Sequence, residues 1–352
     1  MLAEALAKRG HKIVLSLDRV HLETAGPISG VSSIPLDDLD RAAISSIIAR
    51  AATARSPRER SRAVYHTLVG CRERTLVARI AELMRSNAFE LVVVCRALLV
   101  MRGVRLAWPT PTAIVAYTTV TAHGSRPLSS LPCLRLAALD PLVIPKNQRY
   151  EDIWQYTGFW TRPKARARKK VAEEFLEKGA APFFLTMGSM LGFSARALTS
   201  AFVTAARRRG RRVIIQRGWA GLNFRGASDV LVVDEIDYAA VLPRCEAQFL
   251  HGGAGTVTAA LRSGRPIALL PVMPDQVFWA KCLRRLGVCF GTLDPFSVLP
   301  QDFERLMRRE LMNPKYRKAA LKISARLAQN DGLSTACSAL EEFASAAVKS
   351  RQ

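Results

Sequence analysis

The stretch HGGAGTVTAALRSGRPIALLPVMPDQ, residues 251–276, decides the fold of this chain. Residues 247–250 (AQFL) predict the end of a strand, and a glycine-rich turn then leads into a helix over 254–263 that ends at Gly264. The next apolar run, 266–270, is short enough for a buried parallel strand. Strands joined by helices in this way are typical of a doubly wound α/β domain, whose ligands bind at the carboxyl ends of the strands.

The turn after the first of these strands has the features of a phosphate site. Its glycines, Gly252, Gly253 and Gly255, let the backbone approach a ligand closely. The first N–H groups of the following helix lack internal partners and carry the positive end of the helix dipole, so they favour an anion. His251 and Thr256 add side-chain hydrogen-bond donors at the two ends of the turn.

The second strand leads into an acidic loop that carries Asp275 and Gln276. A carboxylate and an amide suit the hydroxyl groups of a ligand. Because the carboxyl ends of neighbouring parallel strands meet at one edge of the sheet, we expect both groups to lie beside the phosphate turn.

A weaker copy of the same arrangement precedes this stretch. Residues 181–186 predict a strand that runs into Gly188 and Ser189, and a helix follows over 194–209. The backbone and hydroxyl groups of this turn are further donors for an anion, although such a turn by itself is a common structural feature.

Acidic residues follow another predicted strand, 230–233, in the sequence DEID at 234–237. They could act as acid or base groups, or they could cap the short helix expected over 238–242. The sequence leaves both interpretations open. Beyond them, a helical stretch over 300–329 is interrupted near Asn313 and Pro314, and a final helix is expected over 334–348.

The first half of the chain is less regular. A helix over 1–9 leads into a strand over 11–17, whereas a doubly wound domain normally opens with a strand and a turn. We therefore expect the first strand and its turn to be missing from this sequence. Further predicted elements are helices over 37–55 and 60–86, strands over 89–95 and 112–117, and a loop over 120–134. His11 is expected to be structural, and His123 a solvated loop residue.

Length and composition set the class of protein. With 352 residues and 49% hydrophobic content, the chain can bury two cores, and the charged break TRPKARARKK at 161–170 is the best boundary between them. The seven cysteines are scattered and never form a CxxC pair, which argues against a disulfide framework or a zinc site. No apolar run is long enough to span a bilayer, so we expect a cytoplasmic protein.

The charge is strongly basic, with 52 Lys and Arg against 29 Asp and Glu, a net +23. The basic stretches carry no interleaved aromatic residues and no nucleic-acid motif, so a nucleic-acid partner is not expected. A solvated, arginine-rich surface is the first interpretation. Attraction to anionic lipid headgroups, with a peripheral position at the inner membrane face, is the second.

The second half closely resembles the nucleotide-sugar-dependent glycosyltransferases of the GT-B fold, in the branch of sterol glucosyltransferases and of the bacterial transferases for antibiotics and rhamnolipids. The resemblance covers about residues 142–344 and rests on ordered matches: TGFW at 157–160, TMGSM at 186–190, GWAGL at 218–222, VVDEID at 232–237, LPRCEAQFLHGGAGT at 242–256 and GRPIALLPVMPDQVFWA at 264–280. In the first half only RGHKI at 9–13 and the strand FELVVV are similar.

The resemblance implies two Rossmann-like domains facing a cleft. Residues 1–160 would form an incomplete domain on the acceptor side, residues 161–335 the domain for the sugar nucleotide, and residues 336–352 a helix that packs back on the first domain. His251 and the turn through Thr256 would hold the diphosphate, with Gly188 and Ser189 facing it.

In the same comparison Asp275 and Gln276 would bind sugar hydroxyls, and the backbone near Ile236 would contact the nucleobase. The general base would come from a turn upstream of Met1, so no catalytic residue is assigned. No metal pair of the DxD kind occurs at the site, and neither a metal nor a cofactor is expected besides the sugar nucleotide.

Two functions follow from this resemblance. The first is an inverting, metal-independent transfer of a hexose from a UDP- or dTDP-sugar to a hydroxyl of a lipid-like, sterol-like or polyketide-like acceptor. The second is a catalytically impaired relative that binds the nucleotide sugar and acts as a partner protein, because the N-terminal turn with the base is absent.

Overall fold

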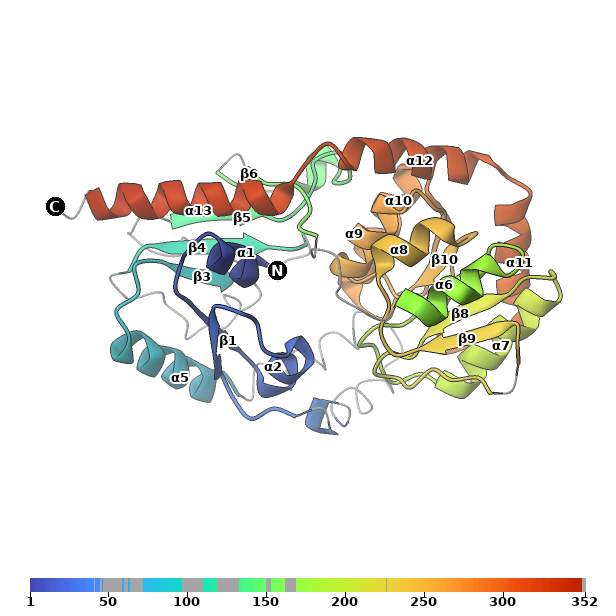
Figure 1. Cartoon of the computed structure of the whole chain (residues 1–352), viewed down its shortest axis with the longest axis horizontal. Coiled ribbons are helices and arrows are strands. Elements are labelled where there is room, and N and C mark those ends of the chain that lie inside the picture. The colour runs from blue at the N-terminus through green and yellow to red at the C-terminus, as the bar shows by residue number, and fades with distance from the viewer. Residues whose placement is uncertain are drawn as a thin grey trace. The chain divides into compact units, whose positions relative to one another are not determined.

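The computed structural model (Figure 1) describes residues 1–40, 42–44, 46, 59, 63, 72–96, 110–118, 133–149, 153–161, 169–225 and 227–349. The chain forms two compact units. Unit 1 comprises residues 1–47, 62–160 and 331–352, and unit 2 comprises residues 48–61 and 161–330. The two units are described separately below.

Unit 2 is built on a six-stranded sheet in which every neighbouring pair of strands is parallel. Its strand order is β12-β11-β10-β7-β8-β9. The strands are β7 (Phe183–Thr186), β8 (Val213–Gln216), β9 (Val230–Val233), β10 (Gln248–Leu250), β11 (Ile267–Leu269) and β12 (Cys289–Thr292). The chain therefore builds outward from β7 to β9, returns to the other side of β7 with β10, and builds outward again. This is the order of a doubly wound nucleotide-binding sheet, with its switch point between β7 and β10.

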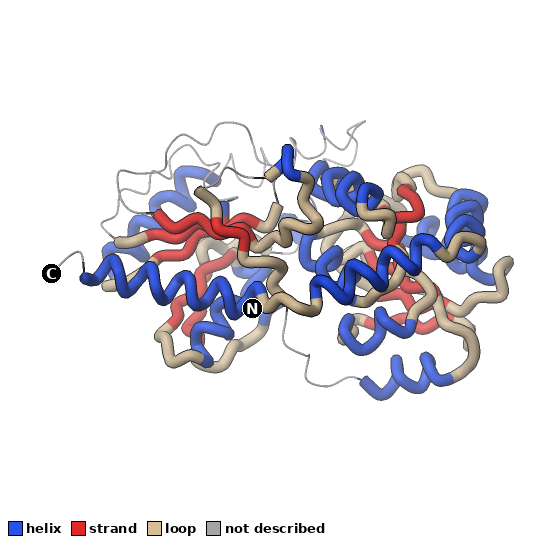
Figure 2. Tube along the Cα trace, turned by 90° about the horizontal axis from the view of Figure 1, so that it is seen from above, coloured by secondary structure: helices blue, strands red, loops and turns tan. Residues whose placement is uncertain are grey.

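Helices cover both faces of this sheet, as Figure 2 shows around the red strands of unit 2. They are α6 (Lys169–Glu177), α7 (Ala195–Arg207), α8 (Tyr238–Val241), α9 (Ala254–Arg262), α10 (Pro274–Arg285), α11 (Pro300–Leu311) and α12 (Lys315–Leu327). Helices α7 and α11 pack against each other over one face. Helices α8 and α9 also contact each other, and Tyr238 of α8 packs edge-on against Phe184 of β7.

Aromatic side chains fill the core beneath α7 and α11. Phe249 of β10 makes edge-on contacts with four other phenylalanines, at centroid distances of 5.0 to 5.8 Å: Phe183, Phe202, Phe290 and Phe303. Phe183 and Phe184 are both fully buried although successive strand residues face opposite sides of a sheet. Both faces of β7 are therefore covered, which is why this strand is a continuous apolar run.

Unit 1 contains two parallel sheets. One pairs β1 (Ile13–Leu17) with β2 (Val31–Pro35), and the other has the order β3-β4-β5-β6. The strands of the second sheet are β3 (Val92–Cys95), β4 (Thr112–Ala116), β5 (Cys133–Ala137) and β6 (Gln155–Tyr156). The helices are α1 (Leu2–Lys8), α2 (Arg19–Ala25), α5 (Glu73–Ser86) and α13 (Gly332–Lys349), with a short 3-10 helix over Lys146–Gln148.

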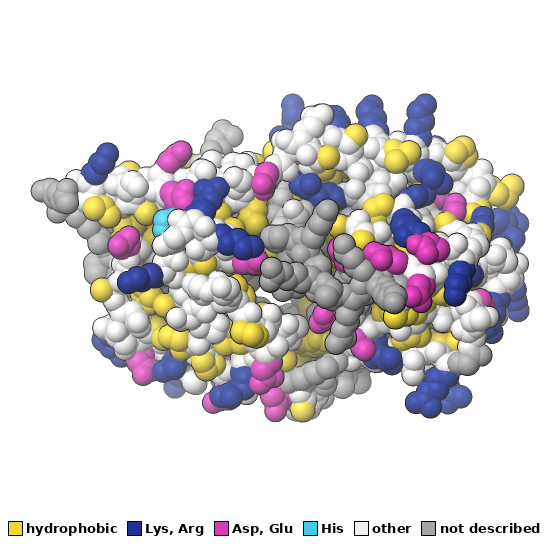
Figure 3. Space-filling view, in the orientation of Figure 1, with side chains coloured by type: hydrophobic (Ala, Val, Ile, Leu, Met, Phe, Trp, Pro, Cys, Tyr) yellow, Lys and Arg dark blue, Asp and Glu magenta, His cyan; other side chains and the backbone are white. Residues whose placement is uncertain are grey.

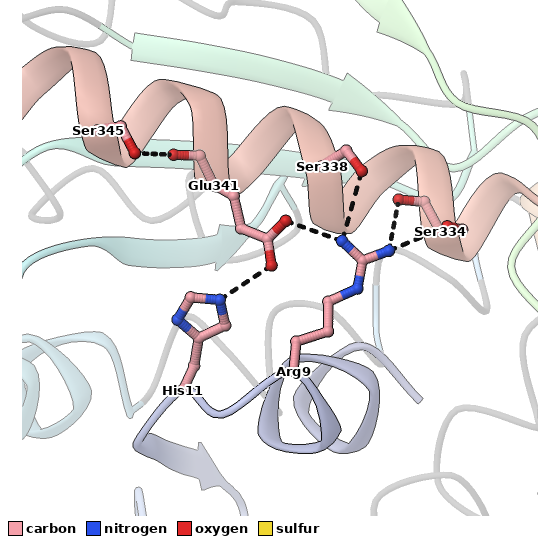
Figure 4. A network of polar contacts seen from close by, with 6 residues as sticks. All are labelled: Arg9, His11, Ser334, Ser338, Glu341 and Ser345. Atoms are coloured by element: carbon pink, nitrogen blue, oxygen red, sulfur yellow. Dashed lines mark hydrogen bonds and ion pairs between the residues drawn. The ribbon is translucent and has the colours of Figure 1, made fainter.

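The last helix, α13, packs on the rest of unit 1 through both apolar and polar contacts. Its buried face joins Leu6 of α1 and Leu136 of β5 in one hydrophobic cluster. Above this cluster Arg9 donates to the Glu341 carboxylate at 2.8 Å and to the Ser334 hydroxyl at 2.9 Å, and His11 Nε2 lies 2.9 Å from the other Glu341 oxygen (Figure 4). His11 therefore has a structural partner, as the sequence predicts.

Most elements expected in unit 2 are confirmed. Strands 181–186 and 230–233 match β7 and β9 within a residue or two, and the break near Pro314 separates α11 from α12. In unit 1, the expected loop over 120–134 is wrong at its end, because β5 begins at Cys133. Elements α2, β2, β6 and β12 are not foreseen from the sequence. Residues 47–58, 64–71 and 119–132, with His123 and much of two predicted helices, lie outside the described residues.

The surface shows the basic character of the sequence. Lys and Arg side chains project from the surface around α12 (Figure 3), and this helix, KYRKAALKISARL, contains no acidic residue. Of the six described cysteines none forms a disulfide, and four are buried: Cys245, Cys282, Cys289 and Cys337. Among the described residues, no helix is both long and apolar enough to cross a membrane.

Candidate functional site

The candidate site lies at the carboxyl ends of β7 and β10, where the strand order of unit 2 reverses. These two strands are direct neighbours, with Leu250 paired to Thr186, and the His251 N–H donates to the Thr186 carbonyl at 3.3 Å. The two turns singled out in the sequence, one after each strand, are therefore adjacent. Ligands of doubly wound sheets bind in the crevice that such a reversal creates.

Two glycines leave room for the imidazole of His251 between them. A Cβ added to Gly188 would stand 2.6 Å from Cε1 of His251, and a Cβ added to Gly253 would stand 2.6 Å from its Nε2. Both distances are far inside van der Waals contact, so neither position tolerates a side chain while the ring stays in place. Gly188 also has a φ of +54°, which favours glycine on its own account.

The His251 ring is buried and electrically neutral. Its residue is 6% exposed, and Nδ1 has no hydrogen-bond partner among the described residues. Burial lowers the pKa of His251 to about 4, and the Thr186 backbone carbonyl opposes this shift only in part. A neutral imidazole carries one N–H, which can donate to an anionic ligand without bringing a positive charge into the protein interior.

The helix that follows His251 begins without a side-chain cap. Gly253 is the N-cap of α9, and its residue type provides no oxygen for the first N–H groups. Within the first turn Gly255 is exposed and Thr256 half-buried. The amides of this turn and the dipole of a nine-residue helix are thus available to an anion beside His251.

Asp275 and Gln276 lie in the first turn of α10, so the acidic loop expected from the sequence is in fact the start of a helix. Gln276 is buried, and its amide oxygen accepts from the N–H groups of Val272 and Met273 at 2.6 and 3.1 Å. Its amide nitrogen lies 3.0 Å from the Met190 sulfur. Gln276 therefore holds the β11–α10 connection in place, a role that the sequence does not reveal.

Gly252 connects the phosphate turn to this second turn. Its φ is +98°, and an added Cβ would lie 3.3 Å from the Cβ of Gln276. Beside it, the half-buried Asp275 carboxyl has its pKa raised by burial, while the backbone N–H groups of Asp275 and Gln276 act in the opposite direction. The structure thus places Gly188 and Gly253 against the His251 ring, and Gly252 against Gln276.

Ser189 and Ile236 are placed less tightly. Ser189 is exposed in the turn that closes when the Met190 N–H donates to the Met187 carbonyl at 2.9 Å. Ile236 is half-buried in the segment between β9 and α8. In that segment Asp237 caps α8 by accepting from the N–H groups of Ala239 and Ala240, so the capping interpretation is confirmed for this residue.

Sequence inspection overlooks a polar group behind the Gly188 turn, formed by Thr186, Gln216 and Tyr238. The Tyr238 hydroxyl and the Thr186 hydroxyl both lie within hydrogen-bond distance of the Gln216 amide oxygen. The signal in the sequence that could have revealed this group is that Thr186 and Gln216 are polar residues at the ends of apolar strands. Of the described residues, no group of three or more His, Cys, Asp or Glu side chains could hold a metal ion.

Sequence comparison connects this geometry to known proteins. The chain is 31% identical over 224 residues to O-mycaminosyltylonolide 6-deoxyallosyltransferase of Streptomyces fradiae, covering 62% of this chain and 52% of that relative. It is 39% identical over 152 residues to vancomycin aglycone glucosyltransferase of Amycolatopsis orientalis, covering 43% and 37% of the two chains. It is 30% identical over 208 residues to sterol 3-beta-glucosyltransferase UGT80A2 of Arabidopsis thaliana, covering 56% and 32%. The predicted resemblance to antibiotic and sterol glycosyltransferases is confirmed.

Solved structures extend the likeness to nearly the whole chain. The calicheamicin glycosyltransferase CalG4 superposes with a TM-score of 0.70 at 16% identity, covering 97% of this chain and 93% of that one. The glycosyltransferase SnogD from Streptomyces nogalater superposes with a TM-score of 0.67 at 19% identity, covering 97% and 94%. The chain has the GT-B fold.

The spinosyn rhamnosyltransferase SpnG, complexed with thymidine diphosphate, has the same fold, with a TM-score of 0.70 at 17% identity over 97% of this chain and 95% of that one. No protein-family model matches the chain. The sequence matches span only part of the curated relatives: 52%, 37% and 32% of the lengths of the three named above.

Proposed function

We propose that the chain transfers a hexose from a UDP- or dTDP-sugar to a hydroxyl group of a lipid-like, sterol-like or polyketide-like acceptor. The observation that carries the proposal is the neutral, buried His251, lying between two glycines at the start of the uncapped helix α9. Such an arrangement suits a diphosphate. The names of the relatives, which include a glucosyltransferase for an antibiotic aglycone and one for a sterol, support the class of reaction and of acceptor.

In the proposed reaction the acceptor oxygen bonds to the anomeric carbon while the bond from that carbon to the diphosphate oxygen breaks. The acceptor proton passes to a general base, which is not assigned to a described residue. Negative charge gathers on the departing diphosphate, and the α9 amides and His251 stabilise it there without reorganising. A single displacement of this kind inverts the anomeric configuration, and the stabilisation by amides and imidazole requires no metal.

Roles for the remaining residues follow the same model. Gly188 and Ser189 would contact the phosphates from the neighbouring turn, and Thr256 would do so from α9. Asp275 would accept hydrogen bonds from sugar hydroxyls, with Gln276 holding the turn that carries it rather than contacting the sugar as the sequence predicts, and the backbone near Ile236 would contact the nucleobase. The thymidine diphosphate bound by the rhamnosyltransferase of the same fold supports a nucleotide ligand of this type.

Calorimetry with UDP, dTDP, UDP-glucose and dTDP-glucose tests the binding step, and mass spectrometry with sterol and polyketide aglycones tests transfer. NMR of the product gives the anomeric configuration, and a repeat in EDTA tests metal independence. Transfer with inversion supports the proposal. Binding without turnover by this chain would favour the alternative, a nucleotide-sugar-binding partner protein. Absence of nucleotide binding would contradict both.

We further propose an anionic membrane surface as a partner. The exposed residues of α12 include five basic side chains, Lys315, Arg317, Lys318, Lys322 and Arg326, together with Leu321. Basic residues near a surface are each attracted to anionic lipid by about 1 kcal/mol. Sedimentation with phosphatidylglycerol vesicles, against phosphatidylcholine vesicles as a control, tests this partner. Equal binding to both lipids would contradict this proposal.

A further inference from the structure

Behind the phosphate turn, one amide oxygen collects two hydroxyl groups. The Tyr238 hydroxyl donates to Oε1 of Gln216 at 2.5 Å, and the Thr186 hydroxyl donates to the same oxygen at 3.1 Å. Thr186 and Gln216 are the last residues of β7 and β8 and are paired across the sheet. Tyr238 begins α8, so three separate elements meet at this oxygen.

The network continues into the candidate site through Thr186. Because the Thr186 hydroxyl gives its single proton to Gln216, its lone pairs stay available, and they accept the Gly188 N–H at 3.2 Å. The Gly188 carbonyl in turn accepts the Trp219 N–H at 2.9 Å. Gly188 is therefore held at both its N–H and its C=O, in the position that leaves room for His251.

The other end of the network reaches the segment after β9. The Gln216 amide nitrogen lies 3.4 Å from the Asp234 carbonyl, two residues before Ile236. The Tyr238 ring is fixed by edge-on packing against Phe184, with 6.0 Å between centroids. Burial raises the pKa of the Tyr238 hydroxyl, and the side chains of Thr186, Thr256 and Gln216 oppose that shift. The phenol therefore stays protonated and remains a donor at neutral pH.

We propose that Tyr238 is a positioning residue for the diphosphate. Its hydroxyl fixes Gln216, which orients the Thr186 hydroxyl, and that hydroxyl sets the Gly188 turn over His251. Tyr238 does not need to touch the ligand for this role. The proposal rests on the function proposed above, and it adds that the turn facing the diphosphate is held in place by a hydrogen-bonded chain that begins at Tyr238 of α8.

Tyr238→Phe tests the proposal because it removes the hydroxyl and keeps the ring that packs on Phe184. Loss of one hydrogen bond in such a network is worth about 1 kcal/mol, so we expect affinity for UDP and dTDP to fall roughly fivefold to tenfold. Affinity for uridine and thymidine, measured by NMR titration, should stay within about twofold, because the nucleosides lack the phosphates. A merely structural role would weaken both classes of ligand together.

Tyr316→Phe is the matched control. The Tyr316 hydroxyl accepts from Arg309 Nε at 2.9 Å and its ring packs edge-on against Phe290, in the same unit but between α11 and α12. It should lose stability comparable to Tyr238→Phe and leave nucleotide binding unchanged. Thr186→Val removes the next hydroxyl of the network. It should also lower the affinity for UDP and dTDP without lowering that for the nucleosides, and it replaces Tyr238→Phe in the test if that variant does not fold.

The outcomes separate the two proposals. If the wild-type chain binds neither UDP nor dTDP, the proposed function fails and the role of Tyr238 fails with it. Two results would overturn only the positioning role, provided that the wild type binds UDP or dTDP. One is equal nucleotide affinity in Tyr238→Phe and the wild type. The other is an equal loss of nucleoside and nucleotide affinity in Tyr238→Phe and Thr186→Val.

Discussion

Gly188 lies directly against the ring of His251, so close that a methyl group on Gly188 would stand 2.6 Å from Cε1 of the imidazole. The contact joins the ends of β7 and β10, 63 residues apart in the sequence (251 minus 188). It also links the two strand–turn–helix segments that the sequence analysis identifies as anion sites. Because the glycine has room for nothing larger, the position of the imidazole depends on Gly188.

Gly188→Ala should therefore displace His251 and weaken nucleotide binding. The added methyl group must push the ring away, and the left-handed backbone costs about 1 kcal/mol more for alanine. We expect affinity for UDP or dTDP to fall by more than about tenfold in calorimetry.

Gly210→Ala is the control for the backbone alone. Gly210 has a φ of +61°, close to the +54° of Gly188, but a Cβ there would meet no atom within 4 Å. This variant should lose stability and keep its nucleotide affinity. Equal nucleotide affinity in the two variants would show that the contact with His251 has no role in binding.

Asp275 and Gln276 are adjacent in sequence but should respond differently to substitution. Gln276→Ala leaves the Val272 and Met273 N–H groups without their acceptor, so we expect a loss of about 1–3 kcal/mol in the free energy of unfolding. Asp275→Asn should preserve stability and weaken binding of the sugar nucleotide more than binding of the nucleoside diphosphate. Urea denaturation and calorimetry on both variants check this. Stable Gln276→Ala protein, or equal losses of both ligands in Asp275→Asn, would contradict the respective role.

Strands β7, β8 and β11 of unit 2 can be predicted from the sequence because they are buried on both faces. Runs such as FFLT, VIIQ and IAL have no polar interruption, and a parallel sheet covered by helices requires this pattern. The phosphate turn is equally visible, since closely spaced glycines before a helix have few other uses. Unit 1 is harder, because β6 has only two residues and carries no periodic signal.

Tertiary contacts within the site could not be predicted. The Tyr238 hydroxyl meets an amide 22 residues earlier in the chain, and no spacing rule connects a helix residue to the end of a distant strand. Gln276 has the residue type of a ligand group, yet its amide oxygen accepts from two backbone N–H groups of its own turn. Which polar groups are already satisfied depends on the folded backbone, and the sequence does not contain that information locally.

His251 should make the stability of the protein depend on pH in the acid range. Its pKa is about 4 in the folded chain and about 6.5 when exposed, so protonation favours the unfolded state. The contribution of the neutral His251 to the free energy of unfolding is complete above about pH 6.5 and is lost as pH falls toward 4. The total loss is limited to about 3 kcal/mol. Urea denaturation of the wild type and of His251→Asn between pH 7.5 and pH 4.5 measures this. The wild type should lose more stability than the variant over that interval, and parallel curves would contradict the assignment.

Glu310 should produce the opposite dependence near neutral pH. It is 5% exposed on α11, its Oε2 has no hydrogen-bond partner among the described residues, and burial, with repulsion from Glu246, raises its pKa to about 7. The attraction of the neighbouring arginines, Arg211, Arg265 and Arg317, only partly offsets these effects.

Because the folded state prefers the protonated carboxyl, the contribution of Glu310 to stability is greatest below about pH 4.5 and is lost as pH rises through 7. Glu310→Gln imitates the protonated group, so its Tm should exceed that of the wild type at pH 8 and match it near pH 5. Glu304→Gln is the control on the same helix, since the Glu304 carboxylate accepts from Arg209 at 2.9 Å and its loss should not raise Tm at either pH. A Tm for Glu310→Gln at or below the wild-type value at pH 8 would show that the carboxylate is adequately compensated by the arginines around it.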